Sequence, residues 1–229
     1  MKTLHLVLLT VAALGAVSSV SAIRFDFYKL DKPNGAGDFL PVDGFSNSND
    51  RVGNPTLTYV KDGLSVTASA MFGGNAAFAI QDSEAGWTDV KGAGLGVYKS
   101  INPIVLSDDN IDVGETLILT FDQVVTLSKI ELRSDKHGIL NWVDGGTFLL
   151  NGVSYGLPKG VGTVHPLGLL TGTVFTFAHS GGISDPTGGP SEDFYLASID
   201  VAVPDSGSTL ALLGLGLLGL AGVARRFLK

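Results

Sequence analysis

Apolar and polar residues alternate along most of the chain after residue 22. In the stretch IRFDFYKL the alternation places Ile23, Phe25 and Phe27 on one face. A repeat of two residues is the pleat of a half-buried strand, whereas a helix repeats every 3.6 residues. Further segments share this pattern and are rich in β-branched and aromatic residues: 64–72, 116–121, 124–132, 173–179 and 194–203. The body is therefore predicted to consist of strands, with helices nearly absent.

Clusters of Gly, Asn, Asp and Pro separate the predicted strands and mark turns. The clearest is Asn151-Gly152, the pair that a type I′ hairpin prefers, so 148–150 is expected to pair antiparallel with 153–155. Many short strands without alternating helices predict an all-β fold. We expect an antiparallel β-sandwich over residues 23–202, with jelly-roll connectivity as one arrangement.

The first 22 residues have the layout of a secretory signal peptide. Lys2 precedes an apolar run over residues 4–17, and small residues follow, with Val20 three positions before the expected cleavage point and Ala22 directly before it. This order of a basic residue, an apolar run and a small-residue site predicts cleavage after Ala22 and export of the mature protein. A buried N-terminal helix is the alternative.

Composition narrows the function classes. The chain has no cysteine, which removes disulfides, thiol nucleophiles and thiolate metal sites from an exported protein. It carries 22 acidic against 15 basic side chains, a formal net charge of −7. Because binding to phosphate backbones relies on clustered Lys and Arg, this balance argues against a nucleic-acid partner.

The most concentrated acidic stretch is LSDDNIDVGETL, directly before a predicted strand. Carboxylates gathered on a loop suit calcium, which takes six to eight oxygen ligands. The candidate calcium ligands are Asp108, Asp109, Asp112 and Glu115, with Asn110 among them. The spacing differs from that of a helix-loop-helix calcium loop, and a solvated acidic loop is the competing interpretation.

Other residues are weaker candidates for a functional site. His137, His165 and His179 stand far apart and outside any metal-binding spacing, so they are expected at the surface or at strand edges. Trp87 and Trp142 lie in loop-like, acidic contexts and are candidates for stacking on sugar rings, with core packing as the alternative. No serine stands in a Gly-x-Ser-x-Gly elbow. We expect no enzymatic activity.

The chain ends in VPDSGSTLALLGLGLLGLAGVARRFLK. Residues 210–224 carry no charge and span about 22 Å as a helix, short of the ~30 Å of a bilayer's hydrocarbon core. The glycines among them give a small-residue surface that suits packing against another membrane helix. The cationic stop that follows, expected to stay on the cytoplasmic side, consists of Arg225, Arg226 and Lys229.

This tail resembles the PEP-CTERM class of sorting signals, and in particular its VPDSG-CTERM variant. The recognition motif consists of Val203, Pro204, Asp205, Ser206 and Gly207, and the hydrophobic segment and the Arg pair follow in the order typical of the class. The resemblance covers residues 203–229. It implies recognition and cleavage by an exosortase, a transpeptidase-like membrane enzyme of Gram-negative bacteria, whose substrates are often linked with extracellular polysaccharide or biofilm.

The expected organisation is thus a signal peptide over residues 1–22, a β-sandwich body over 23–202 and a sorting signal over 203–229 with a transmembrane helix at 210–224. The protein is expected at the inner membrane before processing and at the cell surface or outside the cell afterwards. The body would be structural or adhesive and contact polysaccharide. The rival hypothesis is a secreted carbohydrate-active enzyme with a carboxylate pair.

Overall fold

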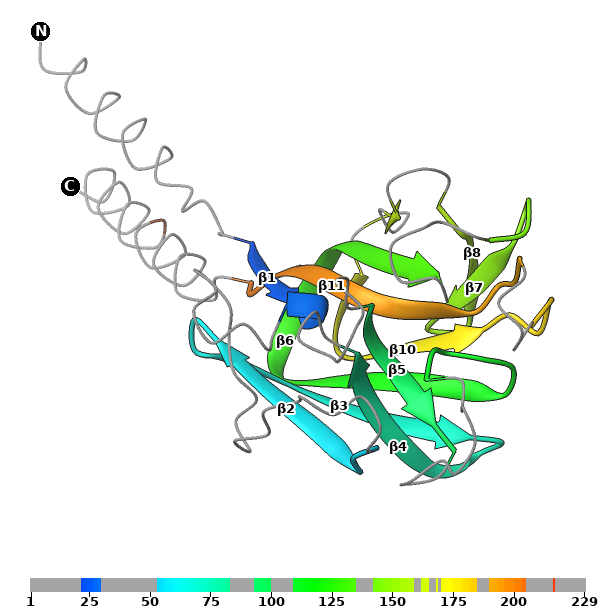
Figure 1. Ribbon diagram of the computed structural model, residues 1–229. Helices are drawn as coiled ribbons and strands as arrows, with labels where there is room; N and C mark the ends of the chain where they lie inside the picture. The colour runs from blue at the N-terminus through cyan, green and yellow to red at the C-terminus, as the bar shows by residue number, and fades with distance from the viewer. Residues whose placement is uncertain are drawn as a thin grey trace, which may run out of the picture. The chain divides into compact units, whose positions relative to one another are not determined.

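The body of the protein is built from antiparallel β-strands (Figure 1). The computed structural model describes residues 22–29, 53–82, 93–99, 109–134, 142–158, 162–164, 168, 170–184, 190–204 and 216. Residues Ala22–Ala202 form a compact unit by themselves. The elements are β1 (Ile23–Asp26), the 3-10 turn η1 (Phe27–Lys29), β2 (Thr56–Lys61), β3 (Leu64–Phe72), β4 (Asn75–Asp82), β5 (Gly94–Tyr98), β6 (Glu115–Ser134), β7 (Thr147–Leu150), β8 (Val153–Gly156), β9 (Thr163–Val164), β10 (Leu170–His179) and β11 (Phe194–Ala202).

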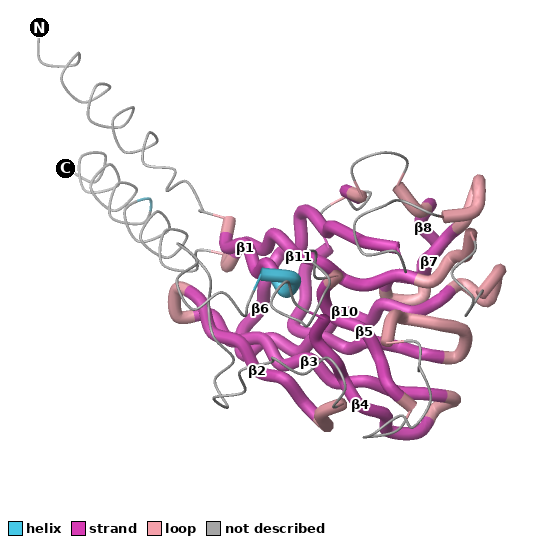
Figure 2. Tube along the Cα trace, viewed as in Figure 1, coloured by secondary structure: helices cyan, strands magenta, loops and turns pink. Residues whose placement is uncertain are grey.

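Five strands close into a ring, in the order β11, β5, β4, β3, β6 and back to β11. The remaining strands extend from this ring: β10, β7 and β8 continue from β6, while β1 pairs with β11, β2 with β3 and β9 with β6. Figure 2 shows strand along most of the described body. The all-β, antiparallel prediction is confirmed. In place of the two separate sheets of a sandwich, the hydrogen-bonded neighbours form one sheet that closes on itself.

The closure depends on β6, which runs for 20 residues. The segments 116–121 and 124–132, expected as two strands, are one continuous strand. Its first part pairs with β3 and β10, and its last part pairs with β11. Buried positions change from odd to even numbers at Ser128 and Lys129, next to a register shift against β11. Because the strand points a different set of side chains inward after this position, it bends, and its two halves can pair with different neighbours around the barrel.

The barrel closes where β5 meets β11, through the pair Leu95 and Leu196. Gly94 has φ +124°, and a Cβ built on it would lie 2.3 Å from the carbonyl oxygen of Leu196. A Cβ on Gly96 would lie 1.7 Å from the carbonyl oxygen of Asp109. Two neighbouring backbones approach β5 so closely that only glycine fits at these positions.

Aromatic side chains fill the interior. Phe148 packs edge-on against Phe194, with ring centroids 5.5 Å apart, and Phe121 packs against Phe175 at 5.9 Å. Phe25, from the predicted alternating face of β1, is fully buried. The predicted hairpin is also confirmed: Asn151 and Gly152 both have positive φ, and β7 pairs with β8 in the expected register, with Phe148 opposite Tyr155.

Candidate functional site

The acidic segment before β6 forms a tight turn. The backbone amide of Asp112 donates to Glu115 Oε2 at 2.8 Å, and the amide of Glu115 donates to the Asp112 carbonyl at 3.0 Å. Asp112 Oδ1 also accepts from the Val113 amide. Gly114 stands at φ +80°, a conformation that L side chains rarely adopt. The two acidic side chains thus hydrogen-bond to the backbone of the turn that directly precedes β6.

The positive charge of Lys99 lies close to both carboxylates of this turn. Lys99 Nζ lies 3.5 Å from Asp112 Oδ2 and 3.8 Å from Glu115 Oε1. The Glu115 side chain is only 1% exposed, so its charge is held by an amide and by this ammonium group. Asp112 and Glu115 are therefore brought together, as the sequence suggested, but with protein partners.

The other candidate calcium ligands lie elsewhere. The Tyr195 hydroxyl donates to Asp109 Oδ1, which ties Asp109 to β11. Asp108 lies outside the described residues. Across the part of the chain that the structure describes, no three His, Cys, Asp or Glu side chains gather as metal ligands. Calcium binding by this segment stays a prediction.

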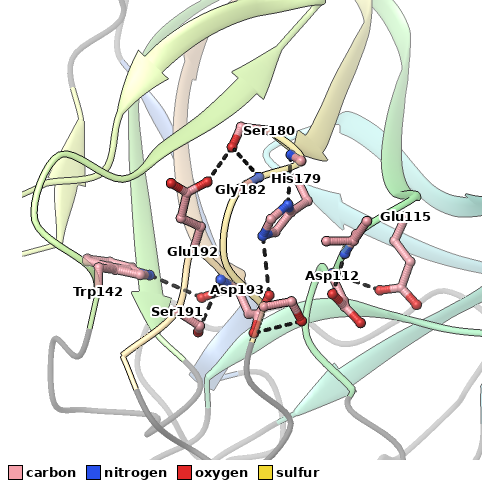
Figure 3. Close-up of polar contacts among 12 residues, drawn as sticks. Asp112, Glu115, Trp142, His179, Ser180, Gly182, Ser191, Glu192 and Asp193 are labelled. Carbon is pink, nitrogen blue, oxygen red and sulfur yellow. Dashed lines mark hydrogen bonds and ion pairs between the residues drawn. The ribbon is translucent and has the colours of Figure 1, made fainter.

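A buried polar junction joins the end of β10 to the start of β11. His179 Nε2 lies 3.3 Å from Asp193 Oδ1, and both side chains are fully buried. Figure 3 shows the two side chains pointing toward each other beside the Asp112–Glu115 turn. His179 Nδ1 accepts a hydrogen bond from the Gly181 amide at 2.9 Å, which places the proton of a neutral ring on Nε2. Nε2 and Asp193 Oδ1 are both buried and form no hydrogen bond with each other.

His179 Nδ1 is thus engaged by a backbone amide, whereas the buried Nε2 lies near the Asp193 carboxylate without a hydrogen bond to it. The nearby serines also have partners of their own, since the Ser180 hydroxyl donates to Glu192 Oε2 and the Ser184 hydroxyl lies 3.4 Å from Asp193 Oδ2. A nucleophilic serine needs a histidine nitrogen that can accept its proton. Among the described contacts, no serine hydroxyl is hydrogen-bonded to a nitrogen of His179.

The prediction of a surface or strand-edge position is wrong for His179, which is buried on β10, a strand paired on both sides. His179 continues the inward face of Phe175 and Phe177 at every second residue of β10. That alternation was visible in the sequence and could have placed the ring inside. Nothing local marked Asp193 as its partner. His137 and His165 lie outside the described residues.

Trp142 belongs to the same junction. Its indole Nε1–H donates to the Asp193 carbonyl at 3.1 Å, and residue 142 forms a bridge with Ser191. The side chain is half-buried, and its polar atom holds the segment before β7 against the start of β11. Trp87, the other candidate for sugar stacking, lies outside the described residues.

A second charged cluster lies at the opposite end of β11. Arg24 on β1 contacts three carboxylates: Asp26 Oδ1 at 2.5 Å, Glu131 Oε2 at 2.7 Å and Asp200 Oδ1 at 3.3 Å. Its own carbonyl accepts from Lys61 Nζ at 2.8 Å. We call Arg24, Asp26, Glu131 and Asp200 the Arg24 network. It joins β1, β6 and β11 on their outer face.

The chain leaves the body directly after this network. β11 ends at Ala202, Val203 is half-buried and Pro204 is exposed, both in irregular backbone. Outside the described residues lie the rest of the motif, Asp205, Ser206 and Gly207, and the cationic stop, Arg225, Arg226 and Lys229. Of the predicted helix 210–224, Gly216 is described and is helical. Among the described residues, no helix combines the length and the hydropathy that a membrane crossing needs.

Comparison with known proteins identifies the tail. Residues 202–227 match the family model of the VPDSG-CTERM motif. No curated protein and no solved structure matches the chain. The match begins at the last residue of β11 and includes the recognition motif, the apolar segment and the Arg pair. The C-terminal residues 202–227 are therefore a VPDSG-CTERM motif, an exosortase-type sorting signal.

Proposed function

We propose that this protein is an exported substrate of an exosortase in a Gram-negative bacterium. After processing, its β-barrel body is located at the cell surface or in the extracellular matrix. The sorting motif implies export and processing by such an enzyme. The hydrophobic segment 210–224 holds the precursor in the inner membrane until the tail is cut. The body is then anchored at the surface or released.

One observation carries the proposal: the fold ends where the motif begins. The compact unit stops at Ala202, and its last strand is paired with β1, β5 and β6. Pro204 is exposed and follows in irregular backbone, as a processing enzyme requires of its substrate. Cleavage within or after the motif removes no strand of the body.

The proposed role of the body is structural or adhesive. Support comes from the acidic and imidazole side chains of the described body, which contact other parts of the fold. His179 and Asp193 join β10 to β11, and Glu115 bonds within its own turn and lies close to Lys99. Exposed side chains on the loops supply the contact surface. Phe72 is 39% exposed at the end of β3, with Lys99 Nζ 4.9 Å from its ring centroid, a polar-flanked aromatic that suits the apolar face of a sugar.

A secreted carbohydrate-active enzyme is the second candidate. The observation in its favour is the proximity of Asp112 and Glu115, which share Lys99. Glycoside hydrolysis needs one protonated and one ionised carboxyl across a groove. Incubation of the full chain with a panel of labelled polysaccharides separates the two: retention without new reducing ends supports adhesion, and new reducing ends support hydrolysis.

Processing of the tail tests the main proposal. In a strain with a working exosortase, intact-mass analysis of the native protein is expected to find a C-terminus that lacks residues 225–229. Replacing Pro204 and Asp205 together by alanine should leave the protein in the membrane fraction at its unprocessed size. The matched control replaces Ser208 and Thr209, which follow the motif, and should be processed normally.

The result that overturns the proposal is equally clear. If the Pro204→Ala, Asp205→Ala variant were released at the same size as the unaltered protein, the motif would play no part in sorting. Recovery of the native protein at the surface with Lys229 still attached would make the tail a permanent anchor.

A further inference from the structure

The segment that leads into the acidic turn lies beside β5. The Val97 amide on β5 donates to the Asn110 carbonyl at 3.0 Å. Lys99, directly after β5, therefore reaches the same place as Asp112, although the two residues are distant in the sequence. Lys99 Nζ lies 3.5 Å from Asp112 Oδ2. The backbone thus holds an amine and a carboxyl group side by side, and these are the two components of an amide.

Three further groups surround this contact. Glu115 Oε1 lies 3.8 Å from Lys99 Nζ, and the Glu115 side chain is only 1% exposed. The Val113 amide donates to Asp112 Oδ1, the carboxyl oxygen that does not contact the lysine. The ring centroid of Phe72 lies 4.9 Å from Nζ. A surface ion pair requires none of the three, but together they supply a base, a donor for an oxyanion and an apolar wall.

We propose that Lys99 and Asp112 join in an isopeptide bond, an amide between their side chains, and that Glu115 acts as the general base and acid in its formation. The chain has no cysteine, so no disulfide can form within it. An amide supplies a covalent link between the end of β5 and the turn before β6. All the groups involved belong to the compact unit Ala22–Ala202, so the inference does not depend on the fate of the tail.

Formation of the bond consumes one ammonium group and one carboxylate and releases one water. Glu115 takes a proton from Lys99 Nζ and passes it to Asp112 Oδ2, so that a neutral amine faces an uncharged carboxyl group. Nζ then attacks Asp112 Cγ to form the C–N bond, while the Val113 amide stabilises the negative charge on Oδ1. The bond from Cγ to Oδ2 breaks, and this oxygen takes a second proton from the nitrogen and leaves as water. Nothing is oxidised or reduced, and Glu115 ends as it began.

The geometry suits this reaction. Reacting atoms in a productive arrangement lie about 3–3.5 Å apart, and the 3.5 Å between Nζ and Oδ2 lies at the edge of that range. The Lys99 side chain is 46% exposed, whereas that of Asp112 is 15% exposed. The lysine can therefore adjust its rotamer toward a carboxyl group that its turn holds in place. The same opening to solvent lets the released water leave.

Trypsin digestion detects the bond directly. Cleavage after Lys91, Lys99 and Lys129 divides an unlinked chain into the separate peptides 92–99 and 100–129. Trypsin does not cleave after a lysine whose amine is acylated. The full chain is purified, kept folded at neutral pH, and then denatured, digested and analysed by mass spectrometry. We expect one peptide, 92–129, lighter than its linear form by one water and without backbone fragments from the closed loop 99–112.

Three variants separate the bond from the ion pair. Lys99→Arg keeps a positive charge beside Asp112, but its guanidinium stays protonated and is no nucleophile. Glu115→Gln keeps an acceptor for the Asp112 amide but removes the base. Both should give the two separate peptides, with the circular dichroism of the unaltered protein. Asp122→Asn, which changes an exposed acid in the same peptide, should leave the link intact.

Thermal denaturation supplies a second readout. A cross-link that closes a loop of about 15 residues restricts the unfolded chain, so the melting temperature of Lys99→Arg should be lower by about 8 °C. Asp122→Asn should melt close to the unaltered protein. Equal melting temperatures for Lys99→Arg and the unaltered protein would contradict a covalent link.

The digest also defines the results that overturn the inference. If the unaltered protein gave only the separate peptides 92–99 and 100–129, Lys99 and Asp112 would form an ion pair and no bond. Loss of water within peptide 100–129, with cleavage after Lys99, would show that a carboxyl group had reacted with its own backbone as a succinimide, which contradicts the link. A link that formed as completely in Glu115→Gln would overturn the role of Glu115.

Discussion

The two ends of β11 are both fixed by charged side chains, but in different surroundings. At its start, Asp193 and His179 meet with both side chains excluded from water. At its end, Arg24 meets three carboxylates while its own side chain stays 31% exposed. The first junction is one contact between two buried groups, and the second is a network shared among three strands.

The difference lies in what happens when a partner is lost. A buried group that loses its partner cannot recover its hydration, and the full desolvation cost appears in the free energy of unfolding. The Arg24 network is partly exposed, with side chains 19–31% exposed, so salt screens it in part and water can reach a group that loses its partner. We therefore expect the start of β11 to be intolerant of substitution and its end, next to the sorting motif, to be tolerant.

Substitution of Gly94 by alanine should have the largest effect. The new Cβ would meet backbone atoms of Leu196 and Ala197 at 2.3–2.7 Å, and φ +124° is unfavourable for any L side chain. Strain and overpacking together predict a loss of about 4 kcal/mol in the free energy of unfolding. Urea denaturation followed by circular dichroism measures it.

The control for this prediction is Gly156→Ala. A Cβ at Gly156 meets nothing within 4 Å, and the residue is absent from the positive-φ positions. Its urea midpoint should stay close to that of the unaltered protein. If Gly94→Ala behaved like Gly156→Ala, the contact between β5 and β11 would not be what closes the barrel.

The second prediction concerns His179→Ala. It leaves the Asp193 carboxylate without its buried imidazole and removes the acceptor of the Gly181 amide. Removing one member of a buried pair costs about 3 kcal/mol or slightly more. Combining it with Asp193→Ala in a double-mutant cycle should recover part of the loss, because the double variant no longer buries the Asp193 carboxylate without its imidazole. Strictly additive losses would show that the two side chains do not interact.

The sequence predicted the strands well because alternation is a local signal. The faces of β3 and β10 and the Asn151-Gly152 hairpin follow from residues that are neighbours in the chain. The first six residues of β11 are all buried, so alternation does not assign its two faces. Closure of the barrel was not predictable, because it depends on β11 pairing with β5 and β6, far away in sequence. Gly94 and Gly96 were visible in GLGV, but no local rule shows which backbone approaches them.

The candidate functional sites show the same contrast between local signals and contacts that are distant in sequence. The sorting motif is a contiguous segment of the sequence, so it could be predicted from the sequence alone. The sequence shows the carboxylates of the acidic segment, from which calcium binding was predicted and stays a prediction, but it hides their protein partners. These are Lys99, directly after β5, and Tyr195 on β11. The Arg24 network was missed for the same reason, since its carboxylates come from β1, β6 and β11.

The third prediction is a smaller loss of stability at the end of β11, in the Arg24 network. Arg24→Met keeps the side chain's length and apolar contacts but removes its charge from the three carboxylates. For this partly exposed network we expect a decrease of about 1 kcal/mol in the free energy of unfolding, and added salt should make the decrease smaller. Denaturation at low and high sodium chloride measures both effects. A loss as large as that of His179→Ala, unaffected by salt, would erase the contrast between the two ends of β11.

The smallest effect is expected from pH. Burial lowers the pKa of Arg24, but hydrogen bonds to Glu131 and Asp26 and the charges of Asp26 and Asp200 outweigh it, so the pKa is raised above its ordinary value. A group whose pKa is raised on folding contributes stability that is fully present below its unfolded pKa, which for arginine lies well above 10. That contribution is lost only as the pH rises through the still higher folded pKa.

The difference in unfolding free energy between the unaltered protein and Arg24→Met should therefore stay constant from pH 6 to pH 10, a window that lies wholly below the arginine pKa. Groups other than Arg24 are present in both proteins, so their contributions cancel in the difference. Urea denaturation of both proteins at each pH gives the measurement. A difference that declined steadily across this window would mean that a group other than the guanidinium sets the strength of the network, and the end of β11 would then respond to pH through a partner not yet identified.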